Sequence, residues 1–201
     1  MAASKKGKSK AASKAKKKAA PPRQILDPRQ MRRVIRRMAG EIVERNNGLE
    51  GVMLVGIRTR GVPLAEALVR EMTKMEEVEV PLGILDITLY RDDLSTIAPQ
   101  PVVKASHFPG PIDDQVVVLC DDVLFTGRTV RAALDALIDY GRPKAVRLAV
   151  LIDRGHRELP IQADVVGESV PTERTELVEV RFKETDGKVG VEVLARESVE
   201  T

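Results

Sequence analysis

The spacing of apolar and polar positions predicts a chain in which strands and helices alternate. Apolar residues recur at helical spacing after Asp27-Pro28, where a carboxylate that can cap a helix precedes a proline suited to the first turn. Asn46-Asn47-Gly48 is a stop signal for that helix, and two more helices are expected at 64–75 and 130–140. Short continuous apolar runs are typical of buried strands. The expected strands are 52–57, 116–120, 145–152 and 163–166, with extended chain over 80–90.

The order of these elements predicts an α/β fold with a central parallel sheet and helices on both of its faces. Two alternating segments near the end of the chain, 176–182 and 189–194, predict a terminal hairpin joined through Asp186-Gly187. Between the early and central strands, residues 91–114 contain several prolines and little periodicity, so they are expected to form a long loop. Loops of this length are usually functional or disordered.

Composition favours a globular body that lies outside membranes. Hydrophobic residues make up 43% of the chain and aromatic residues 2%, so the core is expected to consist mainly of Val, Leu, Ile and Ala. No apolar stretch is long enough to span a bilayer, and no signal-peptide segment is evident, which predicts a cytoplasmic protein without a membrane partner. The single cysteine, Cys120, lies in an apolar run and is interpreted as a buried apolar residue.

Charge divides the chain into two parts. Residues 1–20 hold eight of the 33 basic residues and no acid, which leaves 25 basic and 30 acidic residues elsewhere. This segment of Ala, Lys and Ser is expected to be a disordered basic tail, and residues 21–201 to form one folded domain. Two roles stay open for the tail: a solubilising extension, or salt-sensitive attraction to nucleic-acid phosphates.

The most informative chemistry follows the central strand. An apolar run leads into Asp121 and Asp122, then into the small turn Thr126-Gly127, and then into a helical pattern. Unpaired N–H groups and the dipole at a helix N-terminus favour a phosphate. The carboxylates would repel that phosphate, so a sugar diol or a hydrated magnesium ion is expected beside them. Neither a glycine-rich loop ending in Gly-Lys-Ser/Thr nor a dinucleotide-binding fingerprint is present.

These residues resemble the phosphoribosyl-diphosphate loop of the type I phosphoribosyltransferases. From about residue 25 to 193, the chain is similar to the PyrR family of pyrimidine-operon regulators that have uracil phosphoribosyltransferase activity. Three further stretches carry the resemblance: GIRTRG at 56–61, DITLYRDDL at 86–94 and DRGHRELP at 153–160. The resemblance implies the type I fold with a flexible lid loop, a small cap and a C-terminal hairpin. It also implies dimers that can associate further.

The implied reaction joins uracil to phosphoribosyl diphosphate and yields UMP and diphosphate. Magnesium would be bound mainly through the substrate, and no protein metal site is assigned. Thr126 to Thr129 suit the 5′-phosphate, and the resemblance assigns Asp121 and Asp122 to the ribose hydroxyls. The full phosphoribosyl-diphosphate loop comprises Val117, Val118, Leu119, Cys120, Asp121, Asp122, Val123, Leu124, Phe125, Thr126, Gly127, Arg128 and Thr129.

Three other groups complete the implied active site. The loop after the first buried strand would reach the diphosphate, and the start of the long loop would close over the reacting groups. The cap would receive uracil, largely through backbone groups. The diphosphate loop is Arg58, Thr59, Arg60 and Gly61, the lid residues are Tyr90, Arg91, Asp92 and Asp93, and the cap residues are Asp153, Arg154, Gly155 and His156.

Regulators of this family bind a hairpin of their own messenger RNA, and that role is the second hypothesis for this chain. Two departures weaken it: Gly40 stands where the family tends to carry histidine, and Glu168, which would repel phosphate, stands where it carries lysine. Arginines on the first helix could compensate, or could simply form its solvated face. The chain could thus be mainly an RNA-binding nucleotide sensor, or an enzyme without specific RNA binding. The candidate RNA-binding residues are Arg36, Arg37, Arg45, His156 and Arg157.

Overall fold

The computed structural model describes residues 21–92 and 104–195. Its centre is a five-stranded parallel sheet with the strand order β3-β2-β4-β5-β6. The expected basic tail and Asp93 of the expected lid lie outside the described residues. The strands are β2 (Val52–Ile57), β3 (Leu82–Leu85), β4 (Val116–Leu124), β5 (Ala145–Asp153) and β6 (Val165–Ser169).

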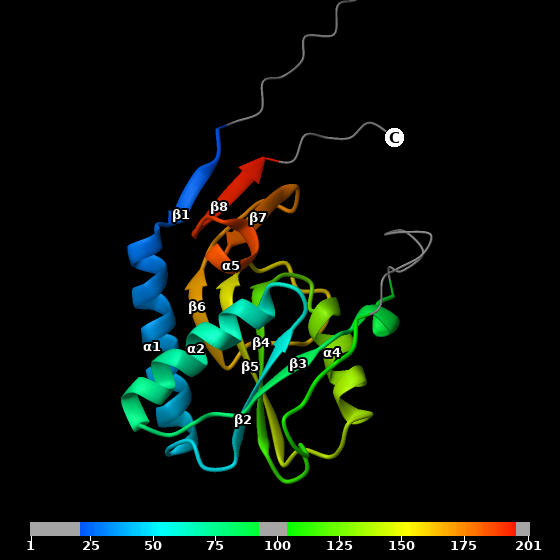
Figure 1. Cartoon of the computed structure of the whole chain (residues 1–201). Helices are drawn as coiled ribbons and strands as arrows, with labels where there is room; N and C mark the ends of the chain where they lie inside the picture. The colour runs from blue at the N-terminus through cyan, green and yellow to red at the C-terminus, as the bar shows by residue number, and fades with distance from the viewer. Residues whose placement is uncertain (1–20, 93–103, 196–201) are drawn as a thin grey trace, which may run out of the picture.

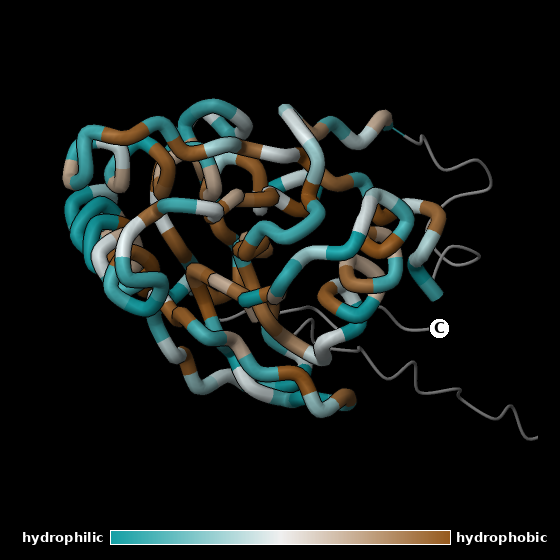
Figure 2. Tube along the Cα trace, turned by 90° about the horizontal axis from the view of Figure 1, so that it is seen from below, coloured by the Kyte–Doolittle hydropathy of each residue, from teal (hydrophilic) through white to brown (hydrophobic). Residues whose placement is uncertain are grey.

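Helices cover both faces of this sheet, as predicted (Figure 1). The helices α1 (Pro28–Asn46) and α2 (Gly61–Glu76) pack on one face, and α4 (Arg128–Ile138) packs on the other. Each face contributes alternate strand residues to its own apolar layer: Leu54 faces α1 and α2, whereas Val55 faces α4. Figure 2 shows hydrophobic segments through the middle of the molecule and hydrophilic chain around its outside.

A second, antiparallel sheet lies over the end of the parallel sheet where the parallel strands terminate (Figure 1). It consists of β1 (Arg23–Leu26), β8 (Gly190–Ala195) and β7 (Glu176–Arg181). The predicted terminal hairpin is confirmed, with a short helix, α5 (Lys183–Asp186), in its connection. Strand β1 was not expected, because four residues are too few to show an alternating pattern.

Several expected boundaries were wrong by a few residues. Strand β4 continues through both aspartates because its pairing with β5 runs on to Leu124 opposite Asp153. Helix α4 begins at Arg128 and ends at Ile138, two residues before each expected boundary. Strand β6 lies two to three residues later than expected.

The first half of the molecule also differs from expectation in two places. Helix α2 begins three residues early, at Gly61, because Pro63 occupies its first turn, where no N–H partner is required. Within the extended segment 80–90, only β3 is a strand, and a 3-10 helix, η1 (Thr88–Tyr90), follows it. Among the helices of the described residues, none has both the length and the apolar character needed to cross a bilayer.

Candidate active site

A pair of carboxylates lies near the carboxyl end of the central strand β4. Asp121 is buried, Asp122 is half-buried, and the Asp122 N–H donates to Asp121 Oδ1 at 2.9 Å. Burial, and secondly the charge of Asp122, raise the pKa of Asp121 well above its usual range. Burial also raises the pKa of Asp122, although a hydrogen bond with Asp121 and the charge of Arg60 oppose that rise. The pair can therefore share one proton and still accept hydrogen bonds from hydroxyl groups.

The N-terminus of α4 follows directly and offers an anion site. Gly127 precedes the helix with φ +93° and has no side chain to cap it, and the hydrogen bond from the Arg128 N–H to Thr126 Oγ1 is long, at 3.4 Å. The N–H groups of that turn can therefore donate to a phosphate, and the helix dipole adds to the attraction. The Thr126 carbonyl accepts hydrogen bonds from the N–H groups of Glu158 and Leu159, at 3.0 and 3.2 Å, so the cap loop rests on this turn.

The side chain of Arg128 was expected to face the phosphate, but in the structure it contacts two carboxylates. Its guanidinium donates to Asp92 at 2.6 Å and to Glu158 at 3.0 Å, and these carboxylates raise its pKa. The guanidinium thus links the start of the expected lid to the cap loop. The charge of Arg128 is thus directed at these two carboxylates, and its backbone N–H donates to Thr126 Oγ1 at 3.4 Å.

The loop after β2 lies against the same end of β4. A β-carbon on Gly61 would be 2.2 Å from the carbonyl oxygen of Cys120, so only glycine permits this approach. The Arg58–Thr59 peptide bond is cis, and Arg58 donates to the Ala105 carbonyl at 3.3 Å. Arg60 forms an ion pair with Asp186 at 2.9 Å. The structure thus brings the expected diphosphate loop beside the carboxylate pair.

The described lid residues do not all lie at this site. The Tyr90 hydroxyl donates to Asp139, which follows the last residue of α4. Since an 11-residue helix is about 16 Å long, the Tyr90 side chain contacts the end of α4 opposite the anion site. In contrast, the positive charge of Arg91 lowers the pKa of Asp121 against the effect of burial, and Asp92 contacts Arg128.

The cap residues form a packed wall beside the turn after β4. Arg154 is buried, and its guanidinium carbon lies 4.1 Å from the centre of the Phe125 ring. Arg154 also donates to Thr172 Oγ1 at 3.1 Å, and the His156 ring contacts the edge of Phe125 and the Thr172 carbonyl. Because these side chains bind one another, the backbone groups of the cap are the ones left to bind a ligand.

Most of the candidate RNA-binding residues have structural partners. Arg157 donates to the carbonyls of Phe125 and Ile161 and to the carboxylate of Asp153, and thereby braces the cap loop. Arg37 donates to two carbonyls of β6, and Arg45 pairs with Glu41 at 2.9 Å.

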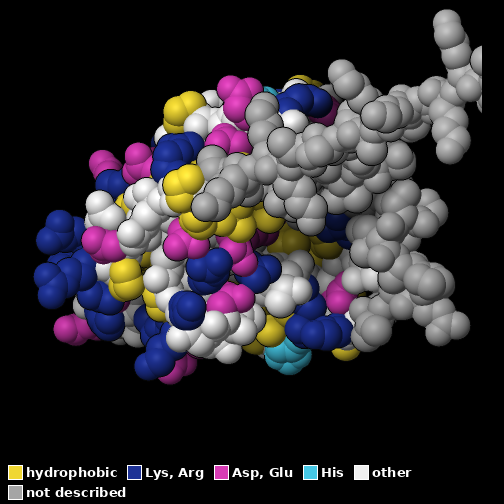
Figure 3. Space-filling view, turned by 90° about the horizontal axis from the view of Figure 1, so that it is seen from above, with side chains coloured by type: hydrophobic (Ala, Val, Ile, Leu, Met, Phe, Trp, Pro, Cys, Tyr) yellow, Lys and Arg dark blue, Asp and Glu magenta, His cyan; other side chains and the backbone are white. Residues whose placement is uncertain are grey.

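Arg36 is placed differently, because it lines a groove between α1 and α2. The arginines of this groove lie on the side of the molecule where Figure 3 shows Lys and Arg side chains gathered. We refer to them as the arginine groove: Arg29, Arg32, Arg33, Arg36 and Arg70.

Asp86 is a residue to which sequence reasoning gave no role. Its carboxylate accepts hydrogen bonds from the N–H groups of Thr88 and Lys104, at 2.8 and 2.9 Å. Burial raises its pKa, but the hydrogen bonds from Thr88 and Lys104 outweigh that effect, and the net shift is downward. Asp86 thus ties together the two described flanks of the segment 93–103. The signal for it is the Asp-x-Thr spacing, which is typical of an Asx turn.

Comparisons with known proteins identify the family of this chain. The family model for the phosphoribosyl transferase domain matches residues 23–183. The bifunctional protein PyrR of Deinococcus radiodurans is 54% identical over 181 residues, which cover 90% of this chain and 99% of the relative. The chain belongs to the PyrR family. Two further PyrR proteins, from Pelotomaculum thermopropionicum and Thermus thermophilus, are 59% and 55% identical and cover 85% and 87% of this chain, and 94% and 96% of their own.

Solved structures support the fold assignment for this PyrR family member. A hypoxanthine phosphoribosyltransferase from Staphylococcus aureus superposes with a TM-score of 0.66 at 16% identity, covering 89% of this chain and 94% of its own. The hypoxanthine phosphoribosyltransferase of Trypanosoma cruzi gives 0.64 at 17% identity, covering 88% and 97%. At these identities the likeness shows the type I phosphoribosyltransferase fold alone.

Proposed function

We propose that this PyrR family member transfers a phosphoribosyl group from phosphoribosyl diphosphate to uracil, forming UMP and diphosphate. One observation carries the proposal: the Asp121–Asp122 pair, the N-terminus of α4 and the loop 58–61 meet at the carboxyl end of β4 and β2. An acid pair for a diol, N–H donors for a phosphate and arginines for a diphosphate are the three groups that this donor requires. Uracil as the base rests on the resemblance to the family.

The chain's residues would act mainly by positioning and by electrostatics. The first-turn N–H groups of α4 bind the 5′-phosphate, and Asp121 and Asp122 accept hydrogen bonds from the ribose hydroxyls. As the bond to the leaving diphosphate breaks, positive charge develops on the sugar and negative charge on the diphosphate. The nearby carboxylates favour the first charge, and Arg58 and Arg60 favour the second. The carbonyls and N–H groups of the cap hold the base in line for attack.

The donor set suits a magnesium ion that is held mostly by the substrate. Among residues 21–92 and 104–195, no group of three or more His, Cys, Asp or Glu side chains could hold a metal on its own. The paired carboxylates could still bind water molecules of a hydrated ion or contribute one oxygen. Bound magnesium would neutralise the diphosphate charge and template the donor.

The test is the formation of labelled UMP from labelled uracil, phosphoribosyl diphosphate and magnesium. Asp122→Asn keeps the size of the side chain but removes its charge, and it should lower kcat/KM by about a hundredfold or more. The matched control is Asp135→Asn, because Asp135 is an exposed carboxylate on α4 that pairs with Arg131 at 3.6 Å. An inactive parent protein, or equal loss in both variants, would contradict the proposal.

We also propose that the protein regulates pyrimidine genes through nucleotide-dependent binding of messenger RNA. The observation that favours this second function is the arginine groove, whose lining contains five exposed arginines from α1 and α2 and one carboxylate, Glu71. Such a groove attracts a polyphosphate backbone in a salt-dependent manner. Glu168 is exposed on β6 and opposes phosphate at that position.

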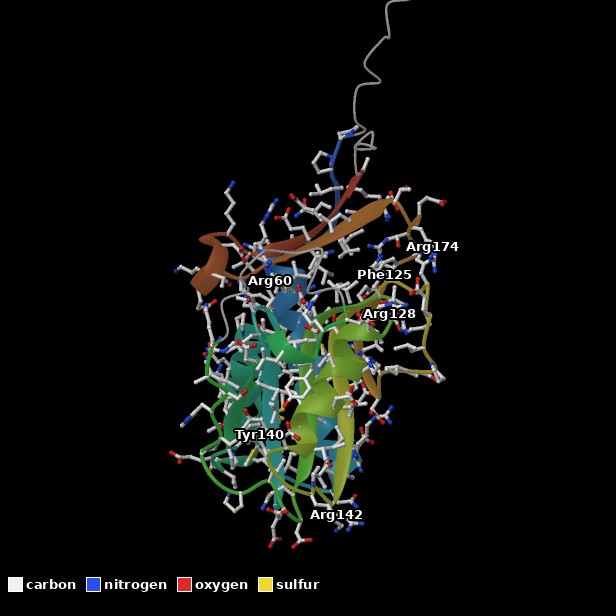
Figure 4. The ribbon with its side chains drawn as sticks, turned by 90° about the vertical axis from the view of Figure 1, so that its right-hand side faces the viewer. Arg60, Phe125, Arg128, Tyr140, Arg142 and Arg174 are labelled. Atoms are coloured by element: carbon white, nitrogen blue, oxygen red, sulfur yellow. The ribbon has the colours of Figure 1, made fainter. Side chains whose placement is uncertain are left out.

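The RNA proposal is tested by gel shift with the leader hairpin, over a salt series and with or without UMP. Arg33→Gln combined with Arg36→Gln should weaken binding and reduce its salt dependence by about one phosphate contact for each arginine. Arg142→Gln is the control, because Arg142 is exposed, does not line the groove, and lies at the end of the molecule opposite Arg60 (Figure 4). A variant lacking residues 1–20 separates the contribution of the tail. If UMP changes nothing, the regulatory proposal fails while the enzymatic one stands.

We further propose, from the family resemblance, that the chain forms homodimers or higher homo-oligomers in the cytoplasm. Light scattering over a range of protein concentrations tests the assembly. A monomer at all concentrations would contradict it.

A further inference from the structure

An ion pair joins the active-site loop to the smaller sheet. Arg60 follows β2, Asp186 ends α5, and the two residues are 126 positions apart in the chain. The guanidinium donates to Asp186 Oδ1 at 2.9 Å, with the Arg60 and Asp186 side chains 38% and 18% exposed. Figure 4 shows Arg60 at the end of the parallel sheet, beneath the smaller sheet. The contact is therefore more sheltered than an ordinary surface pair.

Asp186 is itself held in place. Its second oxygen, Oδ2, accepts the N–H of Phe182 at 3.0 Å, and its own N–H donates to the Phe182 carbonyl at 2.7 Å. Phe182 is buried in the apolar core. The Phe182 N–H, more than Arg60, keeps the pKa of Asp186 below its usual range. Asp186 is thus an ionised, fixed acceptor at neutral pH.

Arg60 also acts on Asp122, one of the two carboxylates of the pair. Its charge opposes the rise in the pKa of Asp122 that burial causes. Arg60 Nε is buried and has no hydrogen-bond partner within the described residues, so Arg60 has N–H groups to offer besides the one bound to Asp186. Arg60 therefore lies within electrostatic reach of Asp122 and binds Asp186 directly.

We infer that Asp186 is a positioning residue for the phosphoribosyl donor, because it fixes the Arg60 guanidinium over the loop 58–61 where the diphosphate would bind. The inference rests on the proposed function and extends it to a residue of α5, the short helix that connects β7 and β8. A mobile arginine carries about 2 kcal/mol of rotamer entropy, part of which is lost when it binds an anion. Asp186 removes that cost before the diphosphate arrives.

The negative charge of Asp186 has the opposite effect, because it reduces the positive potential at the loop. Two features favour positioning as the dominant effect. The Phe182 N–H already balances part of the Asp186 charge, and one carboxylate oxygen occupies only one of the five N–H donors of the guanidinium.

The central test is Asp186→Asn, assayed by calorimetry with magnesium and inorganic diphosphate and by steady-state kinetics. The asparagine oxygen can still accept the Phe182 N–H, whereas its NH₂ group cannot accept a hydrogen bond from Arg60. We expect the Kd for diphosphate and the KM for phosphoribosyl diphosphate to rise about tenfold, equivalent to about 1.4 kcal/mol. We expect kcat and the KM for uracil to change less than about twofold. Asp186→Glu restores the charge and should recover part of the affinity.

Two controls separate positioning from a general weakening of the fold. Glu184→Gln lies on the same short helix and removes an exposed pair with Arg70, at 3.9 Å, so it should leave diphosphate affinity unchanged. In an Arg60→Ala background, Asp186→Asn should have no further effect on that affinity, because the two residues act as one unit. Additive losses would overturn the inference, as would tighter diphosphate binding by Asp186→Asn.

The outcomes distinguish this inference from the proposed function. A parent protein that binds diphosphate in an Asp186-dependent manner but forms no UMP would support the inference and refute the proposed reaction. If the parent forms UMP and Asp186→Asn has the same Kd for diphosphate and the same KM for phosphoribosyl diphosphate, the proposed reaction is supported and the inference is refuted. A parent that binds no diphosphate would overturn the inference.

Discussion

At the scale of single residues, the active site contains a buried carboxyl group that is unfavourable for the stability of the fold. Asp121 is 7% exposed, in the middle of the sheet, and burial raises its pKa. A buried charge is unfavourable unless it is paired, and here the Asp122 N–H is the hydrogen-bond donor while the neighbouring Asp122 carboxylate repels the charge. Such a residue is kept for binding or chemistry rather than for stability.

Asp121→Asn should therefore make the protein more stable at neutral pH while abolishing UMP formation. The folded-state pKa of Asp121 lies above the value of about 3.9 for an unfolded chain. Between those two values the folded state binds more protons, so the free energy of unfolding of the parent falls as pH rises. Asparagine does not titrate, and its amide can donate to Asp122. We expect a gain of about 1 kcal/mol, or about 2–4 °C in Tm, measured by calorimetry.

The pH series makes this prediction specific. The difference between the variant and the parent should shrink as pH is lowered and vanish near or below about pH 4, where both side chains are neutral. Asp135→Asn is the control, because Asp135 is exposed at the surface of α4. A gain that is independent of pH, or a loss at neutral pH, would show that Asp121 is ionised and satisfied in the folded protein.

Arg157 illustrates a residue whose side chain can be assigned two roles. From sequence it is a candidate for RNA binding, but its hydrogen bonds to Phe125, Ile161 and Asp153 make it the brace of the cap loop. Arg157→Lys retains the charge but cannot reproduce this planar set of bonds. We expect a loss of about 1–2 kcal/mol in the free energy of unfolding and a several-fold rise in the KM for uracil.

The matched control is Arg174→Lys, because Arg174 pairs with Glu158 at 3.3 Å and its side chain is 60% exposed. An exposed pair of this kind contributes little to stability. If Arg157→Lys weakens RNA binding without any effect on uracil or on stability, the bracing role is wrong.

At the scale of elements, the sequence predicted what depends on local pattern. The helix α1 has its capping aspartate, its proline and its apolar stripe, and these place its start and end correctly. Boundaries that depend on a partner could not be predicted: β4 is extended by its pairing with β5, and β1 exists only because β8 offers an edge. Similarly, the Tyr90 hydroxyl contacts Asp139 through tertiary packing that no motif encodes.

The start of α2 depends on Gly61, and a comparison of two glycine-to-alanine variants tests this dependence. In Gly61→Ala the new β-carbon would meet the Cys120 carbonyl oxygen at 2.2 Å, so backbone must move on one side or the other. We expect the free energy of unfolding, measured with urea, to fall by about 2 kcal/mol or more, and UMP formation to be lost. Gly40→Ala is the control inside α1, where nothing lies within 4 Å of the new β-carbon. It should raise the free energy of unfolding by about 0.5–1 kcal/mol. Equal effects in the two variants would contradict this close approach.

At the scale of the whole molecule, the two sheets share one core. Val178, Val180 and Val191 of the smaller sheet belong to the same apolar cluster as Met31 and Ile35 of α1. The motifs allowed the two loops and the carboxylate pair to be predicted, because a few residue types in order suffice for them. Asp186 could not be predicted, because its partner is 126 residues away and only the folded chain brings them together.

This shared core leads us to propose that the described residues, 21–92 and 104–195, unfold as one cooperative unit. Separate domains would melt in two steps, whereas a common apolar layer makes the loss of one sheet expose the other. Calorimetry should give one transition whose van't Hoff and calorimetric enthalpies agree.

UMP at about 100 times its Kd should raise the free energy of unfolding by about 2.7 kcal/mol and shift the whole transition. The scan should be repeated at several protein concentrations, since assembly would also raise Tm. Uridine, which lacks the phosphate for the α4 N-terminus, is the control and should shift the transition much less. Two resolved transitions, only one of them moved by UMP, would contradict the single unit and would place the smaller sheet outside the ligand-binding body.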